Sequence, residues 1–243
     1  MDLTDRNAIV TGGAVRVGRA ISLALARAGV NVHVHYNRSS GPAEELQADI
    51  EALGVRASIG AGDLSDSSAA RGIIDGAASS LGPISILVNS ASGFPEDSMD
   101  DLTPSGFTRT QDLTLASPLF LTQAFADLLP DDMAGAVVNI TDVKTERPYL
   151  KHLSYMLAKG GVDTLTKAAA LALAPRIRVN AVALGVILPP PGEGDDYVNA
   201  LASGLPLERV GGAEVVADTV LFLARNDFIT GEIVRVDGGG HLV

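Results

Sequence analysis

The chain has 243 residues, with 29 acidic and 18 basic side chains, a net charge of −11 and no cysteine. With 47% hydrophobic and 19% charged residues it is globular rather than disordered, and its length suits one large domain or two small ones. The acidic balance argues against a nucleic-acid partner, and the lack of cysteine excludes disulfides and thiolate metal sites. No apolar run approaches the roughly 18 residues that cross a bilayer, and the first residues lack the layout of a signal peptide, so we expect no membrane partner and a cytoplasmic protein.

Short apolar runs alternate with helical patterns along the whole chain. The expected strands cover residues 8–10, 30–35, 55–60, 84–88, 136–140, 178–182 and 233–236. The expected helices cover residues 18–28, 42–53, a stretch after residue 66, 104–129, 154–173 and 214–224. This alternation predicts an α/β protein with a seven-stranded parallel sheet covered by helices on both faces, and no boundary divides residues 1–243. Such a sheet binds ligands at the carboxyl ends of its strands, so functional residues are expected there.

A glycine-bearing turn, TGGAVRVGRA from Thr11 to Ala20, follows the first expected strand. Small residues let the backbone approach a pyrophosphate, and the helix that follows presents free N–H groups and a partial positive charge. Gly12 and Gly18 are therefore candidate cofactor contacts, and Arg16 adds positive charge. The alternative is a glycine-rich turn that holds no ligand, but the order strand, turn, helix favours a phosphate site.

The residues after the second expected strand distinguish between nicotinamide cofactors. An NAD site places an acidic residue there, which binds the ribose 2′-hydroxyl. This chain has Asn37, Arg38 and Ser39, and the first acidic residue is Glu44. A guanidinium and a hydroxyl suit a 2′-phosphate, which favours NADP(H); the alternative is an exposed, solvated arginine.

Tyr155 and Lys159 have the spacing i, i+4 on an expected helix, which places them on one face. A neighbouring ammonium favours the phenolate and brings the tyrosine proton within reach of acid–base chemistry, although such a pair is more often surface packing. Asp142 follows the fifth expected strand, 13 residues earlier, and either faces the same substrate or makes a turn. These three residues are the catalytic candidates.

Small residues follow the fourth expected strand, where a cofactor could lie flat across the strand ends. They are Asn89, Ser90, Ala91 and Ser92. Phe94 comes next, and an aromatic ring exposed there could stack on a flat ligand, whereas the alternative is a ring that plugs the core.

Together these residues resemble the short-chain dehydrogenase/reductase family, over essentially the whole chain. The resemblance rests on Thr11–Gly12…Gly18, Asp63–Leu64, Asn89–Ser90–Ala91, Tyr155…Lys159 and Arg178–Val179–Asn180. It implies a single-domain, doubly wound Rossmann fold with strand order 3-2-1-4-5-6-7 and a homotetramer. It further implies that Tyr155 exchanges the substrate proton and that Lys159 binds the nicotinamide ribose and lowers the tyrosine pKa. The adenosine contacts would be Asp63, Leu64, Asn89, Ser90 and Ala91, and further cofactor contacts would be Val17, Thr141, Gly185 and Ile187.

Four positions depart from the common family pattern. Arg16 stands in place of a glycine, Asp142 near the place of a catalytic serine, Thr114 in place of an asparagine, and Leu184 in place of a proline. The first two departures are similar to the pteridine reductases. That similarity implies that Phe94 stacks a pterin against the nicotinamide, that Arg16 and Ser92 lie close to it, and that Asp142 binds its edge and assists Tyr155.

The combined hypothesis is NADPH-dependent reduction of a pterin, dihydropterin or dihydrofolate-like C=N bond. One alternative is a carbonyl reductase of the same fold, acting on a 3-oxoacyl group or another ketone. A second alternative is an NADP-binding subunit without turnover, suggested by Thr114 and Leu184. The segment Pro189–Asp196 corresponds to a mobile substrate lid in relatives, and its glycine and aspartate residues favour a loop. The histidines show no metal-ligand spacing, so we expect no catalytic metal.

Overall fold

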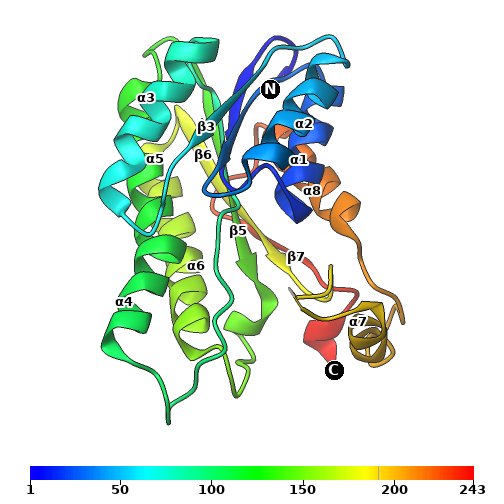
Figure 1. Cartoon of the computed structure of the whole chain (residues 1–243). Helices are drawn as coiled ribbons and strands as arrows, with labels where there is room; N and C mark the ends of the chain where they lie inside the picture. Colours follow the sequence, from blue (N-terminus) through cyan, green and yellow to red (C-terminus); the bar gives the residue numbers. More distant parts are fainter. Residues whose placement is uncertain (191) are drawn as a thin grey trace.

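A computed structural model describes residues 1–190 and 192–243 of the chain. Seven parallel strands form one sheet in the order β3-β2-β1-β4-β5-β6-β7, as the resemblance implies (Figure 1). The strands are β1 Asn7–Val10, β2 Asn31–Tyr36, β3 Ala57–Ala61, β4 Ile86–Asn89, β5 Gly135–Asp142, β6 Ile177–Leu184 and β7 Ile233–Val236. The sheet order reverses between β1 and β4, and this switch point places the loops after these strands side by side.

Helices cover both faces of the sheet. They are α1 Arg16–Arg27, α2 Ser40–Glu51, α3 Ala70–Leu81, α4 Pro104–Gln111, α5 Ser117–Leu128, α6 Leu153–Leu173, α7 Asp195–Ala202 and α8 Ala213–Arg225. Figure 1 shows α1, α2 and α8 on one face and α3, α4, α5 and α6 on the other. Within the described part of the chain, no helix combines the length and hydropathy that a membrane crossing requires.

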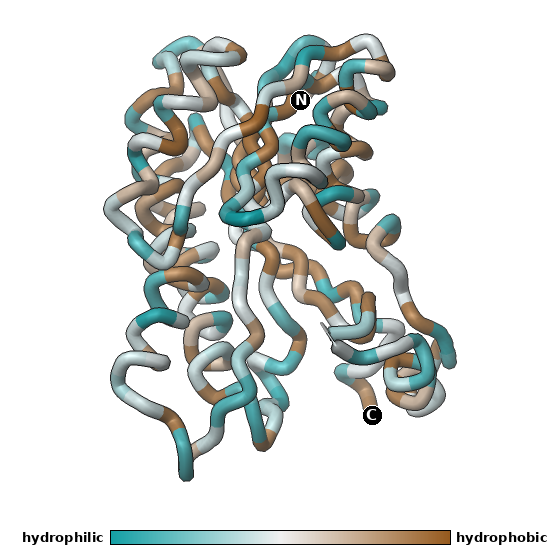
Figure 2. Tube along the Cα trace, in the orientation of Figure 1, coloured by the Kyte–Doolittle hydropathy of each residue, from teal (hydrophilic) through white to brown (hydrophobic). Residues whose placement is uncertain are grey.

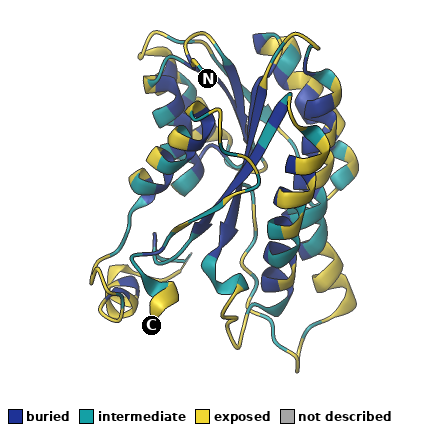
Figure 3. Ribbon diagram, turned by 180° about the vertical axis from the view of Figure 1, so that it is seen from behind, coloured by how far each residue is buried: buried dark blue, intermediate teal, exposed yellow. Residues whose placement is uncertain are grey.

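Two apolar layers fill the space between the sheet and its helices. Alternate strand residues point to opposite faces, so Val10 packs in the layer beneath α1 and α8, whereas Ile9 packs in the layer beneath α3 and α5. All eight residues of β5 are buried. The brown tube segments at the centre of Figure 2 and the dark blue strands of Figure 3 show this core. Strands buried on both faces explain why their sequences read as continuous apolar runs.

Two elements differ from the sequence expectation. The helix expected over residues 104–129 is divided into α4, a π-helical segment over Asp112–Ala116, and α5. The lid segment Pro189–Asp196 leads into helix α7, which begins at Asp195, where a loop was expected. Acidic residues in its first turn suit the positive end of the helix dipole, and Val198 and Ala202, spaced i, i+4, are its buried face. Of the expected lid, Pro191 lies outside the described residues.

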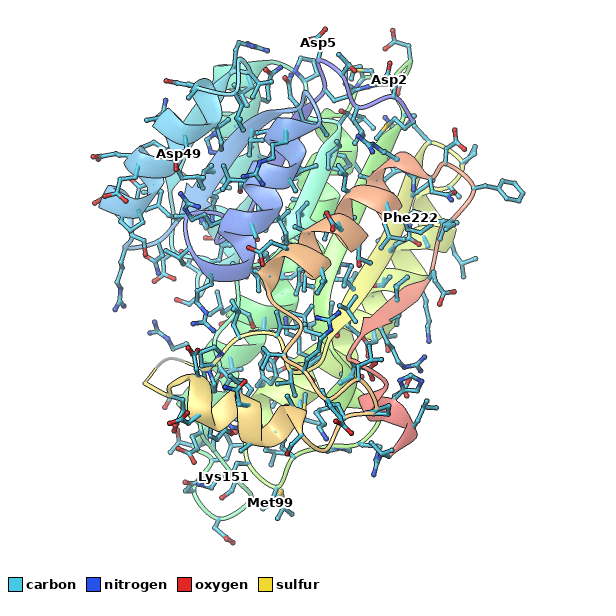
Figure 4. The ribbon with its side chains drawn as sticks, turned by 90° about the vertical axis from the view of Figure 1, so that its right-hand side faces the viewer. Asp2, Asp5, Asp49, Met99, Lys151 and Phe222 are labelled. Atoms are coloured by element: carbon cyan, nitrogen blue, oxygen red, sulfur yellow. The ribbon has the colours of Figure 1, made fainter. Side chains whose placement is uncertain are left out.

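The carboxyl ends of the strands lie at one end of the molecule. Figure 4 labels Lys151 and Met99 there, in the loops around α6 and β4, and labels Asp2 and Asp5 at the opposite end. The sequence motifs after β1, β4 and β5 therefore converge on one edge of the sheet.

Candidate active site

The loop after β1 is shaped so that only glycine fits at two positions. Gly12 has φ of +60°, and a Cβ there would lie 3.1 Å from the Ala91 Cα atom. A Cβ on Gly18 would lie 2.2 Å from the Gly12 carbonyl oxygen. Thr11 Oγ1 accepts hydrogen bonds from the backbone of Ser90 at 2.9 Å and of Ala91 at 3.0 Å, which joins this loop to the end of β4. The result is a bare backbone cradle at a helix N-terminus, which fits a pyrophosphate.

The two arginines of this loop have different partners. Arg16 begins α1 with a positive φ of 54°, and its Nη2 atom donates to the Pro189 carbonyl oxygen at 2.6 Å. Arg19 instead pairs with Asp49 at 2.6 Å on the surface of α2. Arg16 therefore faces the strand ends and the lid segment, whereas Arg19 faces away from them. Val17 is half-buried within the first turn of α1.

The segment after β2 presents its polar side chains to solvent. Asn37 and Arg38 are exposed, and Ser39 precedes α2 as its N-cap without a side-chain capping bond. Hydrogen bonds from Ser65 hold the pKa of Asp63 below its usual value, and the charges of Arg109 and Arg38 lower it further, so Arg38 lies near Asp63. This places the expected 2′-phosphate and adenine contacts side by side.

Leu64, which was also expected to contact adenine, is buried beneath α3. Its side chain is 1% exposed and belongs to the apolar layer that also contains Ile73 and Ile74. The reason is that β3 ends before it and the chain turns inward towards α3. A cofactor contact at Leu64 would therefore involve its backbone, and it stays a prediction.

Asp142, Tyr155 and Lys159 meet at the end of β5. The Tyr155 hydroxyl donates to Asp142 Oδ2 at 3.0 Å, and the Lys144 backbone N–H donates to Asp142 Oδ1 at 2.8 Å. The Lys159 ammonium lies 5.5 Å from the centre of the Tyr155 ring and donates to the Ile140 carbonyl oxygen at 2.7 Å. One oxygen of Asp142 thus closes a turn and the other faces Tyr155, and a contact of Asp142 with substrate stays a prediction.

Burial dominates the proton affinities of this cluster. It lowers the pKa of Lys159 to about 8, while the carboxylates of Asp142 and Asp163 oppose that change. Burial raises the pKa of Asp142, against the hydrogen bonds from Lys144 and Tyr155 and the charge of Lys159. Burial and the Asp142 carboxylate also raise the pKa of Tyr155 well above its usual value. The expected lowering of the Tyr155 pKa by Lys159 is thus not what this arrangement gives, because desolvation and a facing carboxylate both favour the neutral phenol.

Phe94 forms an aromatic wall beside Tyr155. Its ring meets the Tyr155 ring edge-on, with centroids 4.9 Å apart at 89°, and it stacks on His152 with centroids 3.7 Å apart at 15°. Tyr149 lies at the edge of this group, 6.3 Å from Phe94. Phe94 is 37% exposed, which excludes the alternative of a ring that plugs the core.

Two residues that the sequence did not single out hold Phe94 in place. His152 Nδ1 bonds to the Pro95 carbonyl oxygen at 2.8 Å, and its φ of 63° turns the chain sharply into α6. Asp97 accepts hydrogen bonds from the Ser154 backbone and hydroxyl, and so caps α6 from a distant loop. No local pattern signals these contacts, because the partners are about 57 residues apart along the chain.

Asn89 and Thr141 are turned towards the protein interior. Asn89 Nδ2 donates to Asn139 Oδ1 at 2.8 Å, and Asn139 Nδ2 donates to Thr166 Oγ1 at 2.9 Å. Thr141 donates to Asp163 Oδ1 at 2.6 Å. These side chains join β4 and β5 to α6, so cofactor contacts at Asn89 and Thr141 would be made by their backbones and stay predictions.

Thr114 lies in the π-helical segment Asp112–Ala116 and is buried. Its hydroxyl is 3.4 Å from that of Ser92, which is exposed at the aromatic wall. The next residue, Leu115, packs directly on Gly161 of α6, where a Cβ would lie 2.6 Å from Leu115 Cδ2. A π-helical turn often marks a functional position, and this one contains Thr114, the residue that stands in place of the family asparagine.

The end of β6 is closed tightly against the chain after β7. Leu184 stays in the sheet and pairs with Asp142, and a Cβ on Gly185 would lie 2.6 Å from the Asp237 Cα atom. Ile187 is buried, and its Cδ1 atom would lie 2.7 Å from a Cβ on Gly211.

Across the described residues, no three potential metal-ligating side chains come together, and a metal-free reaction stays a prediction.

Comparisons with known proteins agree with this geometry. The family model described as enoyl-(acyl carrier protein) reductase matches residues 13–241. The crystal structure of FolM alternative dihydrofolate reductase 1 from Brucella canis, complexed with NADP, is 36% identical with a TM-score of 0.95, covering 100% of this chain and 96% of that one. A short chain dehydrogenase from Burkholderia cenocepacia J2315, in complex with NADP, is 32% identical with a TM-score of 0.92, covering 98% and 99%. The 3-oxoacyl-(acyl-carrier-protein) reductase FabG of Staphylococcus epidermidis is 31% identical over 98% of this chain and 100% of its own length. With the Rossmann sheet and the Tyr155–Lys159 pair at its edge, this protein belongs to the short-chain dehydrogenase/reductase family of oxidoreductases.

Proposed function

We propose that this enzyme is an NADPH-dependent reductase of a pterin, dihydropterin or dihydrofolate-like C=N bond. The observation that carries this proposal is the hydrogen bond of 3.0 Å from Tyr155 to the buried Asp142 carboxyl, directly beside the exposed Phe94 ring. A carboxylate suits the N–H groups of a 2-amino-4-oxo pterin, which are hydrogen-bond donors, whereas a simple carbonyl offers only acceptors. An aromatic wall suits a flat bicyclic ring.

The residues of the groove fit a phosphate-bearing dinucleotide. The cradle around Gly12 and Gly18 would hold the pyrophosphate, and Arg38 and Ser39 would hold the 2′-phosphate. When bound, NADPH supplies the hydride for the reduction. The NADP complex of the Brucella dihydrofolate reductase supports this cofactor.

The chain's own residues manage the proton. The raised pKa of Tyr155 keeps the phenol neutral, and the raised pKa of Asp142 lets its carboxylate take up a proton more readily than an exposed aspartate does. Tyr155 can therefore donate its proton to the reduced nitrogen, and Asp142, at hydrogen-bond distance, can replace it. The Lys159 charge then stabilises the negative charge left on this pair, because its ammonium is buried beside both groups.

Orientation of the substrate falls to the aromatic and polar side chains around Tyr155. His152 covers one face of the Phe94 ring, and the part of the ring left exposed would stack on the substrate. Ser92 and Arg16 lie at the same edge of the sheet, the first beside Thr114 and the second beside Pro189. These groups restrict a flat ring to one plane, which contributes to the rate through positioning.

A carbonyl reductase is the second candidate, because the Staphylococcus relative named 3-oxoacyl-(acyl-carrier-protein) reductase matches nearly the whole chain. A subunit without turnover is less well supported, since Tyr155 and Lys159 are both present and buried at the sheet edge. The candidates differ in the role that they give to the Asp142 carboxyl group, so a substitution of Asp142 distinguishes them.

The test is NADPH oxidation, followed by its absorbance, with dihydropterin, dihydrofolate and a 3-oxoacyl thioester. Turnover of either pterin-type substrate, with a marked loss in Asp142→Ser, is the expected result. Turnover of the thioester alone, retained or increased in Asp142→Ser, would replace the proposal by the carbonyl candidate. Tight NADPH binding without turnover of any of the three would support the non-catalytic subunit.

The homotetramer also stays a proposal, supported by apolar side chains on the outer surface of the helical layer. Leu119 and Phe120 of α5 and Leu157 of α6 are 43%, 42% and 53% exposed. Residues of this kind on adjacent helices are typical of subunit contacts. Light scattering of the purified protein measures its mass in solution. We expect four times the mass of one chain, and the mass of a single chain would contradict the homotetramer. A cytoplasmic location likewise stays a prediction.

A further inference from the structure

His35 connects two segments of the cofactor groove through its side chain. It lies near the carboxyl end of β2 and is only 2% exposed. Its Nδ1 atom accepts a hydrogen bond from the Gly12 backbone N–H at 3.3 Å, and its Nε2 atom lies 3.1 Å from the Gly62 carbonyl oxygen. An amide N–H only donates and a carbonyl only accepts, so the imidazole is neutral and carries its hydrogen on Nε2.

The two segments that His35 joins hold different parts of the proposed cofactor site. Gly12 belongs to the phosphate cradle, and the next amide, of Gly13, donates to the His35 carbonyl oxygen at 3.0 Å. Gly62 directly precedes Asp63, and its own amide donates to the Tyr36 carbonyl oxygen at 2.9 Å. The 2′-phosphate segment begins two residues after His35. One side chain thus fixes the pyrophosphate cradle relative to the adenine side of the groove.

The fit around this imidazole is tight. A Cβ on Gly62 would lie 3.3 Å from His35 Nε2 and 2.8 Å from Ile73 Cδ1, so glycine is needed for the close approach. Burial lowers the pKa of His35 to about 4, and the hydrogen bond to the Gly62 carbonyl only partly opposes this. Burial also lowers the pKa of His33 on the same strand to about 4, and His33 feels the charge of His35. The ring therefore keeps its acceptor towards Gly12 throughout the neutral pH range.

We propose that His35 is a positioning residue for the adenosine half of NADP(H). By holding the Gly12 amide and the Gly62 carbonyl at a fixed separation, it sets the distance between the pyrophosphate cradle and the adenine side. The proposal rests on the cofactor of the proposed function and not on its substrate. Loss of the imidazole leaves the Gly12 amide without its acceptor and lets the cradle relax, which weakens dinucleotide binding.

His33 provides a matched control on the same strand. It is 3% exposed, two residues away on the same face of β2, and its Nδ1 atom bonds to Ser58 Oγ at 2.8 Å. A Cβ on Gly60 would lie 2.5 Å from His33 Nε2, so its seat against β3 resembles that of His35. His33 makes no hydrogen bond to the phosphate cradle among the described residues. His33→Phe and His35→Phe therefore disturb the core alike but differ in the contact to Gly12.

The experiment measures the NADPH dissociation constant by fluorescence titration, which needs no substrate. We expect His35→Phe to weaken NADPH binding about tenfold and His33→Phe by less than about twofold, because only the first variant loses a hydrogen bond to the phosphate cradle, whereas the second loses its bond to Ser58. In His35→Asn the amide oxygen takes the place of Nδ1 and restores the Gly12 contact but not the Gly62 contact, so we expect partial recovery, to an affinity about threefold below that of the parent protein. Thermal unfolding of each variant reports whether it folds.

Equal weakening in the two phenylalanine variants, or no recovery in His35→Asn, would overturn the proposal. Should His35→Phe not fold, His35→Gln decides, since its amide nitrogen reaches Gly62 but its chain offers no acceptor at the Nδ1 position. Parent-like NADPH affinity in His35→Gln would contradict a positioning role for the Gly12 contact. Failure of the pterin assay leaves these titrations unaffected, so the two proposals fail separately.

Discussion

The two ends of the groove are built by opposite means. At the end formed by the loops after β1, β2 and β3, the contacts come from backbone amides, glycines and the neutral ring of His35. At the end formed by β5 and α6, they come from the buried ionisable side chains of Asp142, Tyr155 and Lys159. Fixed backbone dipoles suit a ligand whose charge does not change, whereas ionisable groups with shifted pKa values suit a reaction that moves a proton.

The largest expected effect comes from removing the phenol at the reacting end. We expect Tyr155→Phe to lower kcat by about a thousandfold, because proton transfer from a positioned group contributes roughly 10²–10⁴-fold. NADPH affinity should stay within about twofold, because the lost hydroxyl contacts Asp142 rather than the cradle. Steady-state kinetics and fluorescence titration measure the two quantities. A variant with parent-like kcat would show that another group supplies the proton.

At the phosphate end the matching change is Gly18→Ala. The added Cβ would meet the Gly12 carbonyl oxygen at 2.2 Å, so the cradle must open. We expect NADPH to bind at least about tenfold more weakly, with a smaller change in kcat at saturating cofactor, since each such loss of about 1.4 kcal/mol is tenfold. Gly72→Ala in exposed α3, with no atom within 4 Å of the new Cβ, is the control and should stabilise the protein slightly. If Gly18→Ala and Gly72→Ala lost the same NADPH affinity, the phosphate cradle would have no special role in binding the cofactor.

A third change tests the aromatic wall between the two ends. Phe94→Leu removes the stacking face while keeping an apolar side chain of similar length. We expect KM for the pterin-type substrate to rise about tenfold, because an aromatic pair is worth roughly 0.5–1.5 kcal/mol beyond its buried area. NADPH affinity should not change. A fall in kcat with an unchanged KM would instead assign Phe94 to the reaction step.

The smallest effect is on stability and concerns Asp142. Burial raises its folded-state pKa above the unfolded value, so the ionised form is disfavoured on folding and costs stability above the unfolded pKa, near 4. Asp142→Asn keeps an acceptor for Lys144 and should give an equal or higher Tm at pH 8. This advantage should shrink as pH falls through the folded-state pKa and disappear below about 4, where the parent carboxyl is protonated in both states. A variant that is less stable at pH 8 would show that the carboxylate is net stabilising.

The sequence predicts the phosphate end more fully than the reacting end. The strand and helix patterns, the glycine loop and the Tyr155–Lys159 spacing all depend on local periodicity, and the sheet confirms the architecture they predict. The stacking of His152 on Phe94 and the capping of α6 by Asp97 depend on loops that meet only in the folded chain. The direction of the Tyr155 pKa likewise depends on burial and on the facing carboxyl, which spacing alone does not reveal.

Helix α7 is a second element that the local sequence pattern did not predict. Its buried pair of Val198 and Ala202 has helical spacing, but the glycines and aspartates before it favour a loop. A helix of eight residues offers too short a pattern for periodicity to outweigh such neighbours.

The contact between Leu115 and Gly161 bears on how this enzyme could be redesigned. The leucine fits into the gap that the missing Cβ leaves, which prevents the two helices from sliding past one another. Tyr155 and Lys159 on α6 thereby keep their position along the helix axis relative to Thr114 in the π-helical segment. Attempts to broaden the range of accepted compounds should therefore leave this interlocked pair intact, together with the loop contacts of Asp97 and His152, and vary other positions of the loops after β4 and β5.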